Sequence, residues 1–408
     1  MVSELAGEFV FDPLDESVRR EPYQLYARAR QECPVYRHVN LPLVSVFTYA
    51  DIVSVFENPV TWSSDFAALV QPYLLARPEL KDEMPPFFAM SDGVRHDSQR
   101  ELIHKAFTPR MMRNFEPTIE AIAAELLDLV LEQREVDLMP TMFHILPLRV
   151  IGSLLGIPRE DADQFDVWAR DLVENQVQGV LRTPSNETIE KQVSATRGLH
   201  GYFRRAIAER RSNPREDLIS GLAAVDERTL SEPDLLQMLT MIMISGFATT
   251  VGLLANAIVD LLRHPDQLAQ LRSELHLVPT AINEVLRFST PVQAMPRICK
   301  AAAEIRGIAV RPGEFVLNWL GSANRDDTVF ERADRFDISR APNPHIAFGF
   351  GPHSCVGSYL AVREGVIVLR MLLERTRGFE LATDAPLPLV SSFVARSYRA
   401  LPMRLSPA

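Results

Sequence analysis

The sequence predicts a mainly α-helical fold with a small β-rich region. Six segments place apolar residues three or four positions apart, as amphipathic helices do: 117–132, 198–211, 233–263, 266–274, 279–288 and 358–375. Four short runs resemble β-strands, at 34–38, 43–48, 304–308 and 315–320. These runs do not alternate with helices as a βαβ fold requires, so we expect a small sheet beside a large helical region.

Two of these elements have clear boundaries. For the helix at 233–263, Ser231 is a good N-cap, Pro233 fits the first turn, and His264 followed by proline ends the pattern. The step Arg311-Pro-Gly-Glu314 predicts a turn that leads into the strand at 315–320.

Composition indicates a globular cytoplasmic protein. The 29 prolines are scattered and no repeat is visible, which favours a single domain over residues 1–408. A net charge of −10 argues against nucleic-acid binding. Three cysteines without metal-type spacing suggest neither disulfides nor structural zinc, and the N-terminus lacks the features of a signal peptide.

Residues 235–259 contain no charged side chain and are long enough to cross a bilayer. Polar residues such as Gln237, Ser245 and Asn256 interrupt the run, however. A central helix of a large protein is also apolar on most sides. We therefore expect a buried helix and no membrane span.

The segment from His345 to Gly357 places a lone cysteine, Cys355, in a glycine-rich loop directly before the helix at 358–375. Gly349, Gly351 and Gly357 allow a sharp turn and close approach to a bulky flat group. Backbone N–H groups at the start of the following helix would favour a thiolate at Cys355.

Two other interpretations of this loop exist. A glycine-rich turn with a buried structural cysteine has the same composition. A dinucleotide-binding loop would begin with Gly349 and Gly351, but Ser354 stands where the third glycine is needed, and no strand–loop–helix unit with a downstream acid follows. We set the dinucleotide interpretation aside.

The pattern F-x-x-G-x-H-x-C-x-G, carried by Phe348, Gly351, His353, Cys355 and Gly357, resembles the haem-binding signature of the cytochrome P450 superfamily. Upstream, Glu284-Val-Leu-Arg287 resembles the family's E-x-x-R, and Arg340 lies in a segment that resembles the one completing its ion-pair cluster. By itself a carboxylate and a guanidinium one turn apart usually form a surface pair. The resemblance implies a cytochrome P450 fold in which these three residues form a buried structural network.

The resemblance also implies haem b, held by Cys355 as the iron ligand. Around it, the expected cofactor-binding residues are His96, Arg100, Arg297, His345, His353, Phe348, Gly349 and Gly357. The histidines and arginines would bind the haem propionates. Any one of them taken alone is equally explained as a solvated surface residue.

Within the long helix, residues 245–250 resemble the family's oxygen-binding segment. Gly246 would leave room for dioxygen, and Thr249 and Thr250 would supply hydroxyls for proton delivery. A threonine in a helix also bonds to the carbonyl four residues earlier, which is the structural alternative. The family usually has an acid where this chain has Ala248, and alanine cannot relay a proton. The usual proton route is therefore in doubt.

These residues together predict a mono-oxygenase of the oxidoreductase class that oxidises an apolar or partly apolar organic substrate, a biosynthetic intermediate, by hydroxylation or epoxidation. Ferredoxin and an NAD(P)H-dependent reductase would supply electrons. The alternatives are a non-hydroxylating oxidation such as coupling or desaturation, and a haem-based gas sensor. The expected substrate pocket comprises Phe66, Phe87, Phe88, Met243, Phe247, Val292, Met295, Phe393 and Val394, all of which are also ordinary core residue types.

Overall fold

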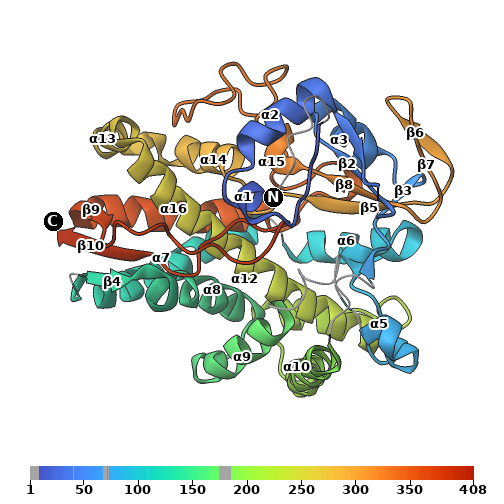
Figure 1. The fold of residues 1–408 in the computed structure, drawn as a ribbon. Helices are drawn as coiled ribbons and strands as arrows, with labels where there is room; N and C mark the ends of the chain where they lie inside the picture. Colours follow the sequence, from blue (N-terminus) through green and yellow to red (C-terminus); the bar gives the residue numbers. More distant parts are fainter. Residues whose placement is uncertain are drawn as a thin grey trace.

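Helix α12, Glu232–Arg263, crosses the molecule diagonally and the other elements are arranged around it (Figure 1). The computed structural model describes residues 9–39, 41–67, 71, 73–107, 109–133, 135–173 and 185–408. On one side of α12 lie α8, α9 and α10. On the other side are α2, α3 and the larger β-sheet (Figure 1).

The helices carry the bulk of the fold. Besides α12 they are α1 Glu16–Arg20, α2 Tyr23–Glu32, α3 Tyr49–Glu57, α5 Tyr73–Ala76, α6 Gly93–Ala106, α7 Pro109–Leu131, α8 Ile145–Leu155, α9 Ala162–Val173, α10 Asn186–Ser212, α11 Leu218–Ala223, α13 Pro265–Ser273, α14 Val278–Phe288, α15 Leu320–Ala323 and α16 Ser358–Arg375. Short helical turns, η2 Phe88–Met90 and η6 Gly351–His353, lie near the site described below.

Within the described residues the strands form three small sheets. Their bounds are β1 Val35–Arg37, β2 Leu43–Val46, β3 Trp62–Ser63, β4 Glu135–Asp137, β5 Met295–Cys299, β6 Ala303–Ile305, β7 Ile308–Val310, β8 Phe315–Asn318, β9 Thr376–Leu381 and β10 Pro402–Pro407. The largest sheet has the order β1-β2-β8-β5-β3, in which only β2 and β8 run parallel. The second has the order β4-β10-β9, and β6 and β7 form a hairpin.

The predicted fold class is confirmed, and all six predicted helices are present. The boundaries of α12 are also as expected, since Ser231 Oγ accepts the backbone N–H of Asp234 and His264 is the C-cap. The run at 304–308 was predicted as one strand, which is wrong. It contains the end of β6, a turn at Arg306 and Gly307, which both have positive φ, and the first residue of β7.

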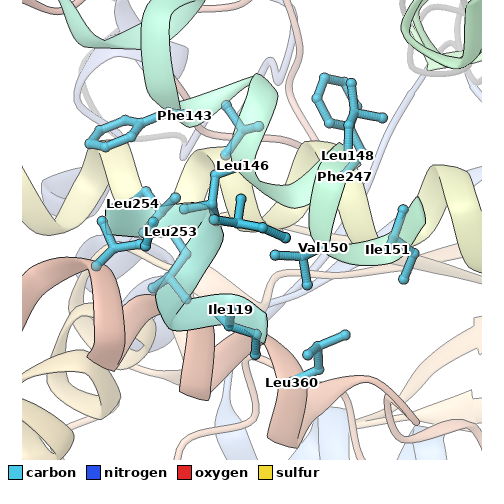
Figure 2. Close-up of a cluster of buried hydrophobic side chains, with 14 of the residues drawn as sticks. Ile119, Phe143, Leu146, Leu148, Val150, Ile151, Phe247, Leu253, Leu254 and Leu360 are labelled. Atoms are coloured by element: carbon cyan, nitrogen blue, oxygen red, sulfur yellow. The ribbon is translucent and has the colours of Figure 1, made fainter. Parts of the chain in front are cut away.

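The apolar residues of α12 are explained by burial. By length and composition this helix could cross a membrane, but 78% of its most apolar stretch is buried inside the protein. It packs against α8, α10, α14 and α16. Figure 2 shows part of this core, in which Leu253 and Leu254 of α12 lie among side chains of α8, such as Leu146.

A buried ion cluster joins α14 to the segment that leads into the cysteine loop. Glu284 and Arg287 are fully buried and their side chains meet at 2.7 Å, while Arg340 Nε lies 3.1 Å from Glu284 Oε2. Glu284 also accepts the backbone N–H of Asp337 at 2.9 Å. One carboxylate thus pairs with two guanidinium groups, as expected for this network.

We expect Glu284→Gln to lower the free energy of unfolding by about 3–5 kcal/mol, because the amide leaves two guanidinium groups, one of them fully buried, without their shared counter-charge. Denaturant unfolding measures the change. The control is Glu16→Gln, which removes an exposed pair with Arg20 and should cost less than about 1 kcal/mol. Equal losses in the two variants would contradict a structural role for the buried cluster.

Candidate active site

The backbone of the cysteine loop needs glycine at two positions. Gly349 and Gly351 have φ of +72° and +71°, which disfavours any side chain. A Cβ on Gly351 would also lie 2.9 Å from the carbonyl oxygen of Phe56. Gly357 differs from the expectation, because its φ is −88°. It is instead the N-cap of α16, where a Cβ would lie 3.9 Å from Cys355 Sγ.

Cys355 is held at the start of α16 with one accessible face. Its N–H donates to the carbonyl of Phe348 at 2.8 Å, which closes the loop. The residue is exposed, yet the protein around its sulfur excludes enough water to raise the pKa of the thiol. A backbone N–H of Gly357 and the charge of Arg100 oppose that rise. A sulfur with donors behind it and one open face is suited to bind a soft metal ion.

Three basic side chains gather beside this loop. The imidazole rings of His96, on α6, and His353, on η6, lie 3.9 Å apart between centroids. His96 Nε2 and His353 Nδ1 are buried and have no hydrogen-bond partner among the residues that the structure describes. The guanidinium of Arg297, on β5, is also buried and lies over the ring of Phe56, and burial lowers its pKa to about 10. The two histidines contact Asp97 and Asp92, whereas the guanidinium of Arg297 has no carboxylate within ion-pair distance among the described residues.

Two other predicted cofactor residues are placed differently. Arg100 is half-buried and donates to Ser354 Oγ at 3.1 Å, within the cysteine loop, as expected. His345 is not brought to the cluster: its Nε2 lies 3.2 Å from Asn283 Oδ1 on α14, and its Nδ1 accepts the N–H of Ala347. Because both ring nitrogens of His345 have partners within the protein, we remove it from the expected propionate-binding residues.

The residues present fit haem. Among the described residues no group of three His, Cys, Asp or Glu side chains could hold a bare metal ion, so a metal at Cys355 would need most of its ligands from a larger group. The unpaired nitrogens of His96 and His353 and the buried guanidinium of Arg297 suit a carboxylate-bearing group. Haem supplies both features.

One face of α12 is accessible although the helix is otherwise buried. Ser245 and Thr249 are exposed, and Met241 and Ala248 are half-buried, at positions that share one side of the helix. Thr249 Oγ1 donates to the carbonyl of Ser245 at 2.9 Å. The hydroxyl oxygen remains able to accept a hydrogen bond. This side therefore presents two hydroxyl-bearing residues in the middle of α12.

The structure corrects three predictions on α12. Met243 and Phe247 were expected in the substrate pocket, but both are buried toward α8. Met243 lines a separate cavity with Ile151, and Figure 2 shows Phe247 among the side chains of α8. Thr250 is also buried, on the side of α12 opposite Ser245. Only Thr249 of the two threonines therefore faces the accessible side.

Gly246 has a packing role that the sequence did not indicate. A Cβ there would approach Ile151 Cδ1 to 3.2 Å, so the glycine allows α8 to lie close to α12. No described contact bears on its expected role in leaving room for dioxygen.

The remaining predicted pocket residues divide into two groups. Phe393 is wrong as a pocket residue, because its ring packs beside Trp319 in an aromatic cluster between α2 and the large sheet. Phe87 and Phe88 are buried next to α6, where Phe88 stacks on His96. Phe66 is buried, whereas Val292, Met295 and Val394 are only partly buried. These last six remain predictions.

Asp92 is a site residue that the sequence analysis missed. It precedes α6, and its carboxylate lies 3.4 Å from His353 Nε2. It also accepts hydrogen bonds from Lys300 Nζ at 3.0 Å, the N–H of Ser64 at 3.1 Å, and Ser63 Oγ. Burial by itself raises the pKa of Asp92, but these donors together hold it well below its usual range. In the sequence, its position four residues before His96 was the feature that could have indicated a role at this site.

Comparison with known proteins identifies similar chains over nearly the whole length. The family model described as Cytochrome P450 matches residues 17–394. The polyketide biosynthesis cytochrome P450 PksS of Bacillus subtilis is 32% identical, covering 98% of this chain and 99% of PksS. A steroid C26-monooxygenase of Mycobacterium tuberculosis is 33% identical, covering 95% of each chain. The crystal structure of CYP109E1 from Bacillus megaterium with testosterone has a TM-score of 0.83 at 31% identity, covering 94% of this chain and 99% of that one.

We expect Asp92→Asn to reduce the free energy of unfolding by about 1.5–3 kcal/mol at pH 7, because its donors lose a charged acceptor. A carboxyl whose pKa is lowered by folding stabilises the protein above its unfolded pKa, about 3.9, and this contribution disappears as pH falls through the folded pKa. The difference from the native chain should therefore narrow below about pH 4.

Urea unfolding between pH 7 and pH 3 measures this difference. Glu101→Gln on the same helix is the control, since its exposed pair with Lys105 should contribute little. If the stability difference between the native chain and Asp92→Asn stayed constant with pH, the charge of Asp92 would have no part in it.

Proposed function

The chain belongs to the cytochrome P450 family, and from this we propose that it is a haem-thiolate mono-oxygenase in which Cys355 binds the iron. Members of this family are oxidoreductases that carry haem b. The observation that carries the ligand assignment is the accessible sulfur of Cys355 within an otherwise desolvating loop. When bound, the haem supplies O–O bond cleavage, so that one oxygen atom enters an organic substrate.

We assign the haem propionates to His96, Arg297 and His353, with Arg100 close by. The nitrogens of His96 and His353 that have no protein partner are the best supported contacts. Asp92 orients His353 from the other side of the ring and limits the net positive charge of the group. Phe348 and Gly349 shape the loop on the cysteine side.

The substrate is an apolar or partly apolar organic molecule, and we propose that it is a biosynthetic intermediate. The named relatives include a polyketide biosynthesis enzyme and a steroid mono-oxygenase, both of which concern largely apolar carbon skeletons. Hydroxylation or epoxidation is the proposed reaction. The accessible Thr249 hydroxyl favours oxygen activation over gas sensing, because a sensor has no need of a proton-delivering group.

Proton delivery must differ from the usual route at Ala248. Thr249 donates its hydroxyl proton to the carbonyl of Ser245. Its hydroxyl oxygen can therefore bind a water molecule only by accepting a hydrogen bond from that water. Ala248 supplies no carboxylate beside it. We propose that a hydroxyl, amide or carboxyl group of the substrate orders this water in place of the missing acid.

Electrons come from outside the chain in this proposal, from a ferredoxin and its NAD(P)H-dependent reductase. The candidate docking residues Lys105, on α6, and Arg113, on α7, are exposed. Lys105 pairs with Glu101, and Arg363 pairs with Glu116 at 2.6 Å. These acids weaken any positive docking surface. Arg110 lies between Lys105 and Arg113 in the chain and would add to this surface, but its side chain lies outside the described residues.

We expect Cys355→Ala to lose the thiolate-type band in the reduced carbon-monoxide difference spectrum, because no other sulfur replaces the ligand. Cys33→Ala is the matched control and should retain the band, since Cys33 is the C-cap of α2 and its sulfur contacts the carbonyl of Val35. A thiolate band in the Cys355→Ala protein would refute the ligand assignment.

Substrate assistance predicts that coupling depends on the ligand. With an analogue lacking the polar group nearest the oxidised carbon, we expect the native chain to form several-fold less product per NAD(P)H and more peroxide, while Ala248→Asp should restore part of the coupling. Thr249→Ala should uncouple with both compounds. If the analogue couples as well as the substrate in the native chain, a proton route from solvent is the better explanation.

A further inference from the structure

A second polar group lies away from the cysteine loop, between α5, α10 and α12. On α10, Gln192, Thr196 and His200 follow one another at intervals of four residues and therefore share one face of the helix. Thr196 lies next to Tyr73 of α5, and His200 lies next to Gln237 of α12. We call these five residues the polar cluster. Each is at most 2% exposed, which is unusual for uncharged polar side chains at a helix contact.

Several atoms of the polar cluster have no partner within the described part of the chain. Tyr73 Oη accepts from Gln71 Nε2 at 2.6 Å and from Gln237 Nε2 at 3.2 Å, and Thr196 Oγ1 donates to the carbonyl of Gln192. Gln192 Oε1, Gln237 Oε1 and both ring nitrogens of His200 remain unpaired. Gln237 is close enough to affect the pKa of His200 but makes no well-formed hydrogen bond to it. The unpaired atoms of Gln237 and His200 are neighbours, and that of Gln192 lies about two helical turns along α10 from His200. Buried polar atoms without partners are rare, which indicates that something else supplies their partners.

The polar cluster lies on the substrate side of α12. Gln237, Met241, Ser245 and Thr249 are spaced by four residues and form one row along the helix, which turns by about 40° at each step. With a rise of 1.5 Å per residue, Gln237 is about 18 Å from Thr249 along the helix axis. A ligand that reaches both residues must therefore be elongated.

The chemistry of the polar cluster favours a neutral ligand group. It contains amides, hydroxyls and an imidazole, and no acid or base other than His200. Burial lowers the pKa of His200 to about 4, so that the ring is neutral at pH 7. A buried carboxylate would find no counter-charge within the cluster, whereas a hydroxyl or amide can both donate and accept here.

We propose that Gln192, His200 and Gln237 form a substrate subsite for an uncharged hydroxyl or amide group, at the opposite end of the substrate from the carbon that is oxidised. This inference rests on the proposed mono-oxygenase function and adds the substrate's length and polarity to it. When the ligand group binds, the longer hydrogen bond of the cluster, from Gln237 to Tyr73, breaks and Gln237 bonds to the ligand instead. The shorter hydrogen bond, from Gln71 to Tyr73, stays in place.

Linear probes of matched length test the proposal on the haem-loaded protein. An extended chain advances about 1.2 Å per bond, so about 14 carbons span the distance from Thr249 to Gln237. The probes are 1-tetradecanol, tetradecanamide, tetradecane, tetradecanoate and 1-octanol, and the shift of the haem absorption band on binding gives each Kd. We expect the alcohol and the amide to bind about three- to tenfold more tightly than the alkane and the carboxylate. 1-Octanol should show no such advantage over octane, which is added as the reference for the short alcohol.

Variants separate the subsite from general effects. Gln237→Met and His200→Leu should remove the preference for the 14-carbon alcohol and leave the Kd of tetradecane within about twofold. Thr240→Val is the matched control, because its hydroxyl is buried on the same helix but already bonded to the carbonyl of Leu236. This variant should retain the preference.

The outcomes distinguish the two proposals. If the native protein shows a thiolate-type carbon-monoxide band but binds alkane and alcohol equally, the subsite is refuted while the proposed function stands. A preference that survives in both Gln237→Met and His200→Leu also refutes the subsite. Absence of the band would instead contradict the proposed function itself.

Discussion

The buried carboxylate of Glu284 is the constraint on which the site depends. Its two partners, Arg287 and Arg340, also donate to backbone carbonyls of the segment before the cysteine loop, including those of Ala333 and Arg335. A segment with little regular structure is thereby fixed against α14 by charge-assisted hydrogen bonds. Because loss of the Glu284 carboxylate would leave both guanidinium groups without their counter-charge, the cluster favours the one loop conformation in which all three side chains meet. The position of Cys355 follows from that of the loop.

The charge balance beside the loop explains how the protein is prepared for a cofactor. His96, Arg297 and His353 concentrate donors in a buried place, where Asp92 contacts His353 and the exposed Asp97 contacts His96. These carboxylates make the group tolerable in the protein alone, since a cation buried without any counter-charge is costly. They do not occupy His96 Nε2 and His353 Nδ1. Each histidine thus contacts a carboxylate of the protein through one ring nitrogen and keeps the other ring nitrogen for the cofactor.

The two sides of α12 have different tasks. The side with Met243 and Phe247 packs against α8, where Gly246 permits close contact, and it fixes the helix in the core. The other side keeps Ser245 and Thr249 accessible and continues to Gln237 in the polar cluster. A single rigid helix therefore links the oxygen-activating position with the proposed far end of the substrate. Because the helix is rigid, the distance between these two positions is fixed, and the protein would therefore select substrates by their length.

The sequence by itself determined the features that are local along the chain. Three features are of this kind: the glycines around Cys355, the individual caps of α12 and the pair Glu284–Arg287. Each involves residues only a few positions apart, so that short-range geometry constrains it. Tertiary structure alone decided which side of α12 is accessible, because a helix that is apolar on nearly all sides carries no periodic signal of its orientation. Met243, Phe247 and Thr250 were misassigned for this reason. Asp92 and the polar cluster were likewise invisible, since ordinary polar residues from distant segments gain their meaning only when packing removes water from all of them at once.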